Sequence, residues 1–206
     1  MTPIASSPLD ALFSRPMVRI LRYLVTHPGS YTGRALASAA RVTQPRAVEA
    51  LATLSAMGVI QRRRAGRAYL YSLNEASFLV SDILKPAFSR EARWLEYLGA
   101  EAFRAAGRAA ESVLLYGSWV RAKAAERSDI DLLVVTRTKE SVRDAVSRLD
   151  EARVGLAERF GRPVSLLVLA RSDFIGRIRQ GDSLMRDIVR EARVLHGKTL
   201  AELIRA

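Results

Sequence analysis

The stretch VLLYGSWVRAKAAERSDIDLLVV, residues 113–135, decides how the C-terminal part of this chain folds. An apolar run ends at Gly117 and Ser118, and a second apolar run follows a basic segment. Short apolar runs bounded by turn residues predict buried strands. Asp129 and Asp131 stand where the second strand begins, although a strand buried on both faces rarely carries charge.

Asp129 and Asp131 are separated by one residue, so in a strand their carboxylates project from the same face. Two like charges at that distance repel each other unless a cation neutralises them. Mg²⁺, or Mn²⁺ in its place, is the expected cation because such a hard ion binds one or two carboxylates together with substrate phosphates. The alternative is that the two aspartates are only a cap and a surface acid at a strand start.

The residues between the two runs predict a phosphate site. A short helix is expected to begin near Trp119, and a helix N-terminus offers free N–H groups and a positive dipole end to phosphate. Gly117 lets a phosphate approach the backbone, Ser118 adds a hydroxyl, and Arg121 and Lys123 can neutralise the rest of a triphosphate. Trp119 can either flank a bound base or pack in the core.

GSWVRAKAAERSDIDLLVV, residues 117–135, resembles the minimal nucleotidyltransferases of the polymerase-β superfamily, whose signature is a Gly-Ser turn followed by Ser-Asp-x-Asp on the next strand. The interval of twelve positions from Gly117 to Asp129 matches the minimal members. The resemblance spans about residues 109–197 and includes IVREARVLHG, residues 188–197, as the expected final helix.

This resemblance implies metal-dependent transfer of a nucleotidyl group from a nucleoside triphosphate (NTP) to a hydroxyl on a protein or nucleic-acid acceptor. It implies that Asp129 and Asp131 are catalytic and bind the metal. It also implies nucleotide binding by Gly117, Ser118, Arg121 and Lys123.

Two departures from the family signature leave an alternative open. Ala122 stands where the family usually has glycine, and the third strand, in RPVSLLVLARSDF (residues 162–174), has no acid between Pro163 and Ala170. Ser165 takes the place of the expected third carboxylate. The alternative is therefore a transcriptional regulator whose degenerate nucleotidyltransferase domain binds nucleotide without turnover.

The N-terminal part has a different pattern. Residues 15–75 contain short amphipathic helical patterns separated by turn signals, followed by two β-type runs that flank Ala65 and Gly66. YTGRALASAARVTQPRAVEALATLSAMGVIQRRRAGRAYLYSLN, residues 31–74, resembles the small winged-helix bacterial regulators of the ArsR and MarR type. The resemblance implies a winged helix-turn-helix that binds double-stranded DNA, often as a homodimer.

The DNA-binding residues expected from this pattern lie in the third helix and the wing. Polar residues at the start of a recognition helix contact base edges, whereas wing arginines contact phosphates. Residues 1–75 hold ten Arg, no Lys and three acids, and so carry +7 of the net charge of +12. The alternative is a protein-binding module with a solvated basic face. The candidates are Thr43, Gln44, Arg46, Arg62, Arg63, Arg64 and Arg67.

We therefore expect an α+β protein with three parts: a winged helix-turn-helix over residues 1–75, a helical connector over 76–108, and a nucleotidyltransferase domain with a mixed sheet and flanking helices over 109–206. The chain has no cysteine, which excludes disulfides and thiolate metal sites. It has neither a stretch of about 20 apolar residues nor a secretory signal pattern. These features predict a cytoplasmic protein without a membrane partner.

Overall fold

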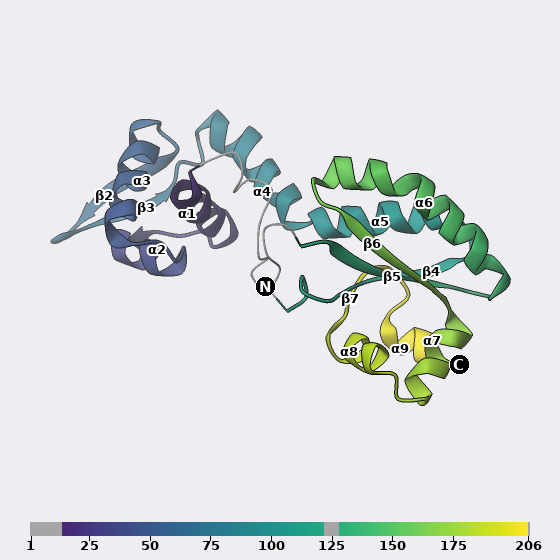
Figure 1. Ribbon diagram of the computed structural model, residues 1–206. Coiled ribbons are helices and arrows are strands. Elements are labelled where there is room, and N and C mark those ends of the chain that lie inside the picture. Colours follow the sequence, from purple (N-terminus) through teal and green to yellow (C-terminus); the bar gives the residue numbers. More distant parts are fainter. Residues whose placement is uncertain (1–13, 122–127, 206) are drawn as a thin grey trace. The chain divides into compact units, whose positions relative to one another are not determined.

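The computed structural model describes residues 14–121 and 128–205. The chain divides into two compact units between Ala92 and Arg93, and Figure 1 shows the elements of each unit. Each unit has its own hydrophobic core, as independent domains do.

The N-terminal unit is a winged helix-turn-helix. Three helices precede a two-stranded hairpin, and the short first strand pairs with the second strand of that hairpin in an antiparallel sheet ordered β1-β3-β2. This confirms the fold expected from the sequence. Its elements are α1 (Arg15–Thr26), β1 (Tyr31–Thr32), α2 (Gly33–Ala39), α3 (Gln44–Ala56), β2 (Ile60–Ala65), β3 (Ala68–Leu73), the π-helix η2 (Leu79–Leu84) and α4 (Lys85–Ala92).

Local residue types explain where these helices begin and end. The Thr32 hydroxyl accepts a hydrogen bond from the Ala35 N–H and caps α2. Pro45 lies in the first turn of α3, where its missing N–H removes no helical hydrogen bond. Gly58, with φ of 68°, follows α3 in the left-handed region that glycine adopts without strain.

A buried ion pair joins helix α4 to helix α1 of the winged helix. Arg22 of α1 donates from Nε to Glu91 Oε2 at 3.0 Å and from Nη2 to Glu91 Oε1 at 3.1 Å. Glu91 is buried, and bidentate pairs between arginine and a carboxylate are among the stronger charge-assisted hydrogen bonds. Helix α4, which lies within the expected connector, is therefore part of the N-terminal unit.

The C-terminal unit is a four-stranded mixed sheet ordered β6-β5-β4-β7, in which only β5 and β6 are parallel. Helices α5 and α6 cover one face, and α7, α8 and α9 cover the other (Figure 1). The expected mixed sheet with flanking helices is confirmed. Its elements are α5 (Trp94–Ala106), β4 (Ala110–Tyr116), β5 (Ile130–Thr136), α6 (Glu140–Phe160), β6 (Val164–Ala170), α7 (Arg171–Arg179), α8 (Ser183–Glu191), β7 (Arg193–Gly197) and α9 (Leu200–Ile204).

The segment IVREARVLHG differs from the expected final helix. It is helical only to Glu191, and Ala192 adopts an extended conformation from which β7 continues. Residues of β7 pair with β4, as Arg193 does with Leu115. The backbone therefore gains inter-strand hydrogen bonds in place of helical ones.

Strand β5 is apolar because helices cover both of its faces. Ile130, Leu132 and Val134 belong to the core beneath α5 and α6. Leu133 and Val135 belong to the core beneath α7 and α8. Asp131 shares their face by alternation, so its carboxylate lies at the edge of the second core.

In the described ranges, no helix combines the length and apolar character needed to cross a bilayer.

Candidate nucleotide and metal site

The strand register aligns Asp131 with one residue on each neighbouring strand. Asp131 pairs with Tyr116 of β4 and with Ser165 of β6. Paired residues in neighbouring strands share a face, so Tyr116, Asp131 and Ser165 form a row across the sheet. The neighbour of Asp131 on the third strand is thus a serine, as expected from the sequence.

Asp173 does not substitute for the missing acid. It lies in the first turn of α7, after the end of β6, and forms an ion pair with Lys139 at 2.7 Å. Asp131 lies near the beginning of β5. Since β5 and β6 are parallel, Asp173 and Asp131 lie at opposite ends of these strands.

Gly117 is in contact with the carboxylate of Asp131. A methyl carbon built on Gly117 would overlap the Asp131 Oδ2 atom. The φ of Gly117 is 76°, in the left-handed region that favours glycine. Two features therefore favour glycine at position 117: its backbone conformation, and the space beside it that the Asp131 carboxylate occupies.

The carboxylate pair lacks full compensation of its charge. Burial, followed by the negative charge of Asp129, raises the pKa of Asp131, and Arg121 partly opposes this rise. Burial and the charge of Asp131 also raise the pKa of Tyr116. A cation between Asp129 and Asp131 would relieve this repulsion.

These residues fit a divalent ion that keeps part of its water shell. Within the described ranges no group of three or more His, Cys, Asp or Glu residues could hold a metal. Asp129 and Asp131 offer two carboxylates, and Mg²⁺ typically takes one or two together with phosphate oxygens and water. Asp129 and Asp131 would hold the ion in this arrangement.

Arg121 is linked to α8 by an ion pair. Its Nη1 atom donates to Glu191 Oε2 at 3.3 Å, and donation from Arg190 and then Arg121 lowers the pKa of Glu191. Arg121 also lowers the pKa of Asp131. It therefore lies within electrostatic reach of both the aspartate and α8. The sequence did not indicate Glu191, which is 70 residues away.

Ser118 lies in a turn that follows β4. Residues 117–121 form consecutive turns, so the short helix expected near Trp119 is not observed in this described stretch. The Ser118 hydroxyl is half-buried and has no hydrogen-bond partner among the described residues. Lys123 and Ala122 lie outside the described residues.

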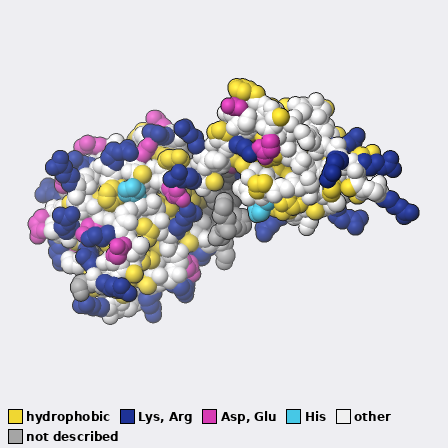
Figure 2. All heavy atoms as spheres, turned by 180° about the vertical axis from the view of Figure 1, so that it is seen from behind, with side chains coloured by type: hydrophobic (Ala, Val, Ile, Leu, Met, Phe, Trp, Pro, Cys, Tyr) yellow, Lys and Arg dark blue, Asp and Glu magenta, His cyan; other side chains and the backbone are white. Residues whose placement is uncertain are grey.

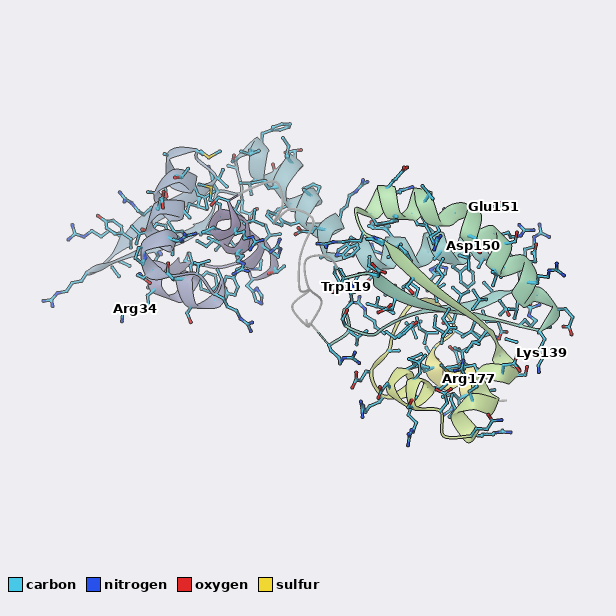
Figure 3. The ribbon with its side chains drawn as sticks, in the orientation of Figure 1. Arg34, Trp119, Lys139, Asp150, Glu151 and Arg177 are labelled. Carbon is cyan, nitrogen blue, oxygen red and sulfur yellow. The ribbon has the colours of Figure 1, made fainter. Side chains whose placement is uncertain are left out.

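Trp119, labelled in Figure 3, packs in the core. It is 6% exposed, and its ring meets Trp94 edge-on at 5.6 Å between centroids. Its Nε1 atom donates to the Ser128 carbonyl at 3.3 Å. Trp119 thus ties the end of the Gly-Ser turn to the residue before Asp129, a positioning role that the large aromatic after the turn could have signalled.

The candidate DNA-binding residues of α3 lie on its solvent side. Thr43, Gln44 and Arg46 are exposed, whereas Ala47 is buried. Thr43 occupies the N-cap position without a side-chain capping hydrogen bond. Its hydroxyl is therefore available at the N-terminal end of α3, where recognition helices contact bases.

The wing arginines extend along the β2–β3 hairpin. Arg62, Arg63, Arg64 and Arg67 are all exposed, and none forms an ion pair in the part of the chain that the structure describes. Arg62 stacks on Tyr69 at 4.5 Å, and Arg64 donates from Nε to the Gly66 carbonyl at 3.3 Å. Arg34 of α2, labelled in Figure 3, is also exposed. The unit thus carries uncompensated positive charge on a protruding hairpin.

The comparisons assign a family to the C-terminal unit. Residues 100–196 match the family model described as "Nucleotidyltransferase domain". The protein therefore combines a winged helix-turn-helix with a nucleotidyltransferase domain. No curated protein matches the chain.

Three solved structures illustrate the similarity. Lactococcus lactis ZitR, in a mutant apo form, is 20% identical over 43% of this chain and 66% of its own, with a TM-score of 0.36. Mb0332 from Mycobacterium bovis is described as a homodimeric winged helix-turn-helix DNA-binding domain of a possible ArsR-family regulator. It is 24% identical over 43% of this chain and 78% of its own, with a TM-score of 0.35. A toxin-antitoxin crystal structure with AMP-PNP is 16% identical over 52% of this chain and 77% of its own, with a TM-score of 0.34. These scores are low, so the winged-helix assignment rests on the order and pairing of its own elements.

Proposed function

We propose that the protein is a metal-dependent nucleotidyltransferase that transfers a nucleotidyl group from an NTP to a hydroxyl acceptor. The observation that carries this proposal is the contact of Gly117 with the Asp131 carboxylate at the end of β4. It joins a phosphate-accessible turn to a charged aspartate pair whose repulsion favours a cation.

Each residue of the site has a distinct role in this reaction. The Gly117 backbone and the Ser118 hydroxyl bind the triphosphate, while Arg121 adds positive charge. Asp129 and Asp131 hold Mg²⁺ or Mn²⁺, which when bound neutralises charge on the phosphates and on the departing pyrophosphate. Lys123 is proposed to assist in binding the triphosphate.

The transfer exchanges one phosphorus–oxygen bond for another. The acceptor oxygen forms a bond to the α-phosphorus as the bond to the pyrophosphate oxygen breaks. Ser165 beside Asp131 offers no carboxylate to take the hydroxyl proton. The proton therefore passes to solvent or to a phosphate oxygen, which predicts slow turnover.

The test is incubation with each of four labelled NTPs and Mg²⁺ or Mn²⁺. Metal-dependent pyrophosphate release should be lost in Asp129→Ala and Asp131→Ala. Asp150→Ala is the matched control, because Asp150 is an exposed acid of α6 (Figure 3). Release that persists in both site variants would refute the assignment of these aspartates.

A second candidate function is favoured by Ser165, which pairs with Asp131 where the family expects an acid. The domain would then bind nucleotide without turnover and regulate the winged helix. Ser165→Asp separates the two candidates: it should raise pyrophosphate release if the site is catalytic. NTP binding without release in both proteins, with altered DNA affinity, would support the sensor.

We also propose that the winged helix binds double-stranded DNA and that the protein is a homodimer. The exposed wing arginines support the first proposal. Two large apolar side chains in the connector region support the second, since Phe78 is 70% exposed and Ile83 is 49% exposed. Light scattering should give a dimer mass that falls in Phe78→Ser/Ile83→Ser; an unchanged mass would exclude this face.

A further inference from the structure

A groove runs along α5 and β7 of the C-terminal unit. A depression of about 720 Å³ includes Arg104 and Arg108 among its lining residues, and a neighbouring one of about 450 Å³ includes Tyr97. Ala100 and His196 line both, so the two depressions adjoin each other. We call them together the α5–β7 groove.

Positive charge at one end of the groove is uncompensated. Arg104 and Arg108 are exposed, and neither has a side-chain hydrogen bond or ion pair within the described ranges. Arg148 lies beside Gly107 and is held by Asp144 at 2.9 Å. Figure 2 shows this unit with a histidine set among Lys or Arg and apolar side chains. An anionic ligand would gain two free arginines here.

Two aromatic side chains, Tyr97 and Phe103, line the same groove as these arginines. Tyr97 is 42% exposed and has Arg93 over its ring at 5.7 Å. Phe103 lies 4.7 Å from the ring of His196. Basic grooves with exposed aromatic rings bind single-stranded nucleic acid, because cations follow the phosphates while bases stack on the rings. The acid at the Tyr97 end, Glu96, is already paired with Arg93.

The Tyr97 end of the groove lies at the same end of the sheet as the aspartate pair, on the face that α5 covers, whereas Asp131 shares the opposite face with Leu133 and Val135. A strand that leaves the groove at Tyr97 therefore has to pass this end of the sheet to reach the aspartates. In β7, Arg193 pairs with Leu115, the residue before the Tyr116 that pairs with Asp131. Helix α5 extends from there for about 20 Å, given its rise of about 1.5 Å per residue.

We propose that the α5–β7 groove binds a single-stranded polynucleotide and that this strand is the acceptor of the transferred nucleotide. As a binding site the groove is independent of turnover, whereas the acceptor role rests on the proposed function. The acceptor oxygen is then a terminal ribose or deoxyribose hydroxyl, which bonds to the α-phosphorus as pyrophosphate leaves and its proton passes to solvent.

The binding test uses the full chain with the four wing arginines replaced by alanine, so that the winged helix contributes little. Fluorescence anisotropy of a labelled single-stranded dodecamer should show affinity that falls about tenfold in Arg104→Ala/Arg108→Ala. The salt slope should become shallower by about 1.4, at about 0.7 per lost phosphate contact. Tyr97→Ala should weaken binding by about fivefold or more through lost stacking.

The matched control is Arg153→Ala/Arg186→Ala, which removes two exposed arginines outside the groove. Equal loss in this control would overturn the site, as would unchanged binding in the groove variant. If free pyrophosphate, at an equal concentration of phosphate groups, displaces the labelled dodecamer, the groove is a site for small anions. That result would overturn the proposal that it binds a polynucleotide.

The acceptor role is tested separately with labelled NTP and the same dodecamer. The label should appear on the oligonucleotide, and should be lost both in Asp131→Ala, which still binds the strand, and in the groove variant. Binding in the groove with pyrophosphate released but no label on the strand would refute the acceptor role. Absence of both release and label, with groove binding intact, would count against the proposed function and leave the groove as a binding site.

Discussion

At the scale of single residues, the site depends on the contact between Gly117 and Asp131. The left-handed φ of the glycine and the lack of a side chain allow the carboxylate to lie against the turn. Asp129 and Asp131 are close enough for one charge to raise the pKa of the other. The proposed site for a metal and a triphosphate therefore depends on the absence of a side chain at Gly117.

Gly117→Ala tests this dependence. The added methyl group overlaps Asp131 Oδ2 and strains the backbone, so stability should fall by about 1–3 kcal/mol. Binding of Mg²⁺ and NTP, measured by calorimetry, should be lost. Gly155→Ala is the control, because nothing lies within 4 Å of its added carbon and it should stabilise α6 by up to about 1 kcal/mol. Unimpaired ligand binding in Gly117→Ala would contradict the arrangement.

The raised pKa of Asp131 has a consequence for stability. A carboxyl group whose folded pKa exceeds its unfolded value opposes folding once it is charged, so its penalty grows as pH rises through that interval. Asp131→Asn should therefore stabilise the metal-free protein at pH 7 and have no such effect below about pH 3.9. Urea unfolding at the two pH values measures this. Destabilisation at pH 7 would show that the charge is compensated.

At the scale of elements, the register of three strands positions the site. The two short apolar runs bounded by turn residues allowed both strands to be predicted, and the spacing of one residue between Asp129 and Asp131 allowed their shared face to be predicted. The alignment of Ser165 with Asp131 was likewise expected and is observed. Strand β7 was missed because a short apolar run after a helix is compatible with either structure. The Arg121–Glu191 pair could not be predicted, since it joins residues that only the folded sheet brings together.

The junction of α1 and α4 provides a test of element packing. Glu91→Ala removes the buried partner of Arg22 and should lower the free energy of unfolding of the N-terminal unit by about 2–3 kcal/mol. Lys85→Ala, which breaks the exposed pair with Glu75, should change it by no more than about 0.5 kcal/mol. Both tryptophans, Trp94 and Trp119, lie in the C-terminal unit. Unfolding of both variants in urea should therefore be followed by far-UV circular dichroism rather than by tryptophan fluorescence. Equal effects would mean that burial of the pair contributes nothing.

At the scale of the whole molecule, the chain combines two kinds of basic surface with one acidic pair. The wing carries four exposed arginines, and the α5–β7 groove carries two that are unpaired in the described ranges. The aspartate pair, in contrast, is an acidic site whose mutual repulsion a cation would relieve. A duplex and a single strand would thus be bound by separate units, one through a protruding hairpin and the other through an aromatic groove.

Replacing the four wing arginines by alanine tests the first of these surfaces. Phosphate contacts release counterions, so affinity for every duplex should fall and the salt slope should become shallower by about 3.6, at about 0.9 for each of the four contacts. The charge-matched control replaces Arg143, Arg153, Arg179 and Arg186, four exposed arginines of the C-terminal unit. Anisotropy with two unrelated duplexes over a range of salt concentrations measures both slopes. A salt slope that is unchanged by the wing variant, or reduced equally by the control, would make the winged helix a protein-binding module.

The same wing variant also tests the base contacts of α3. If it still prefers one duplex sequence over another, the base contacts are assigned to Thr43, Gln44 and Arg46 of α3, where the exposed polar side chains lie.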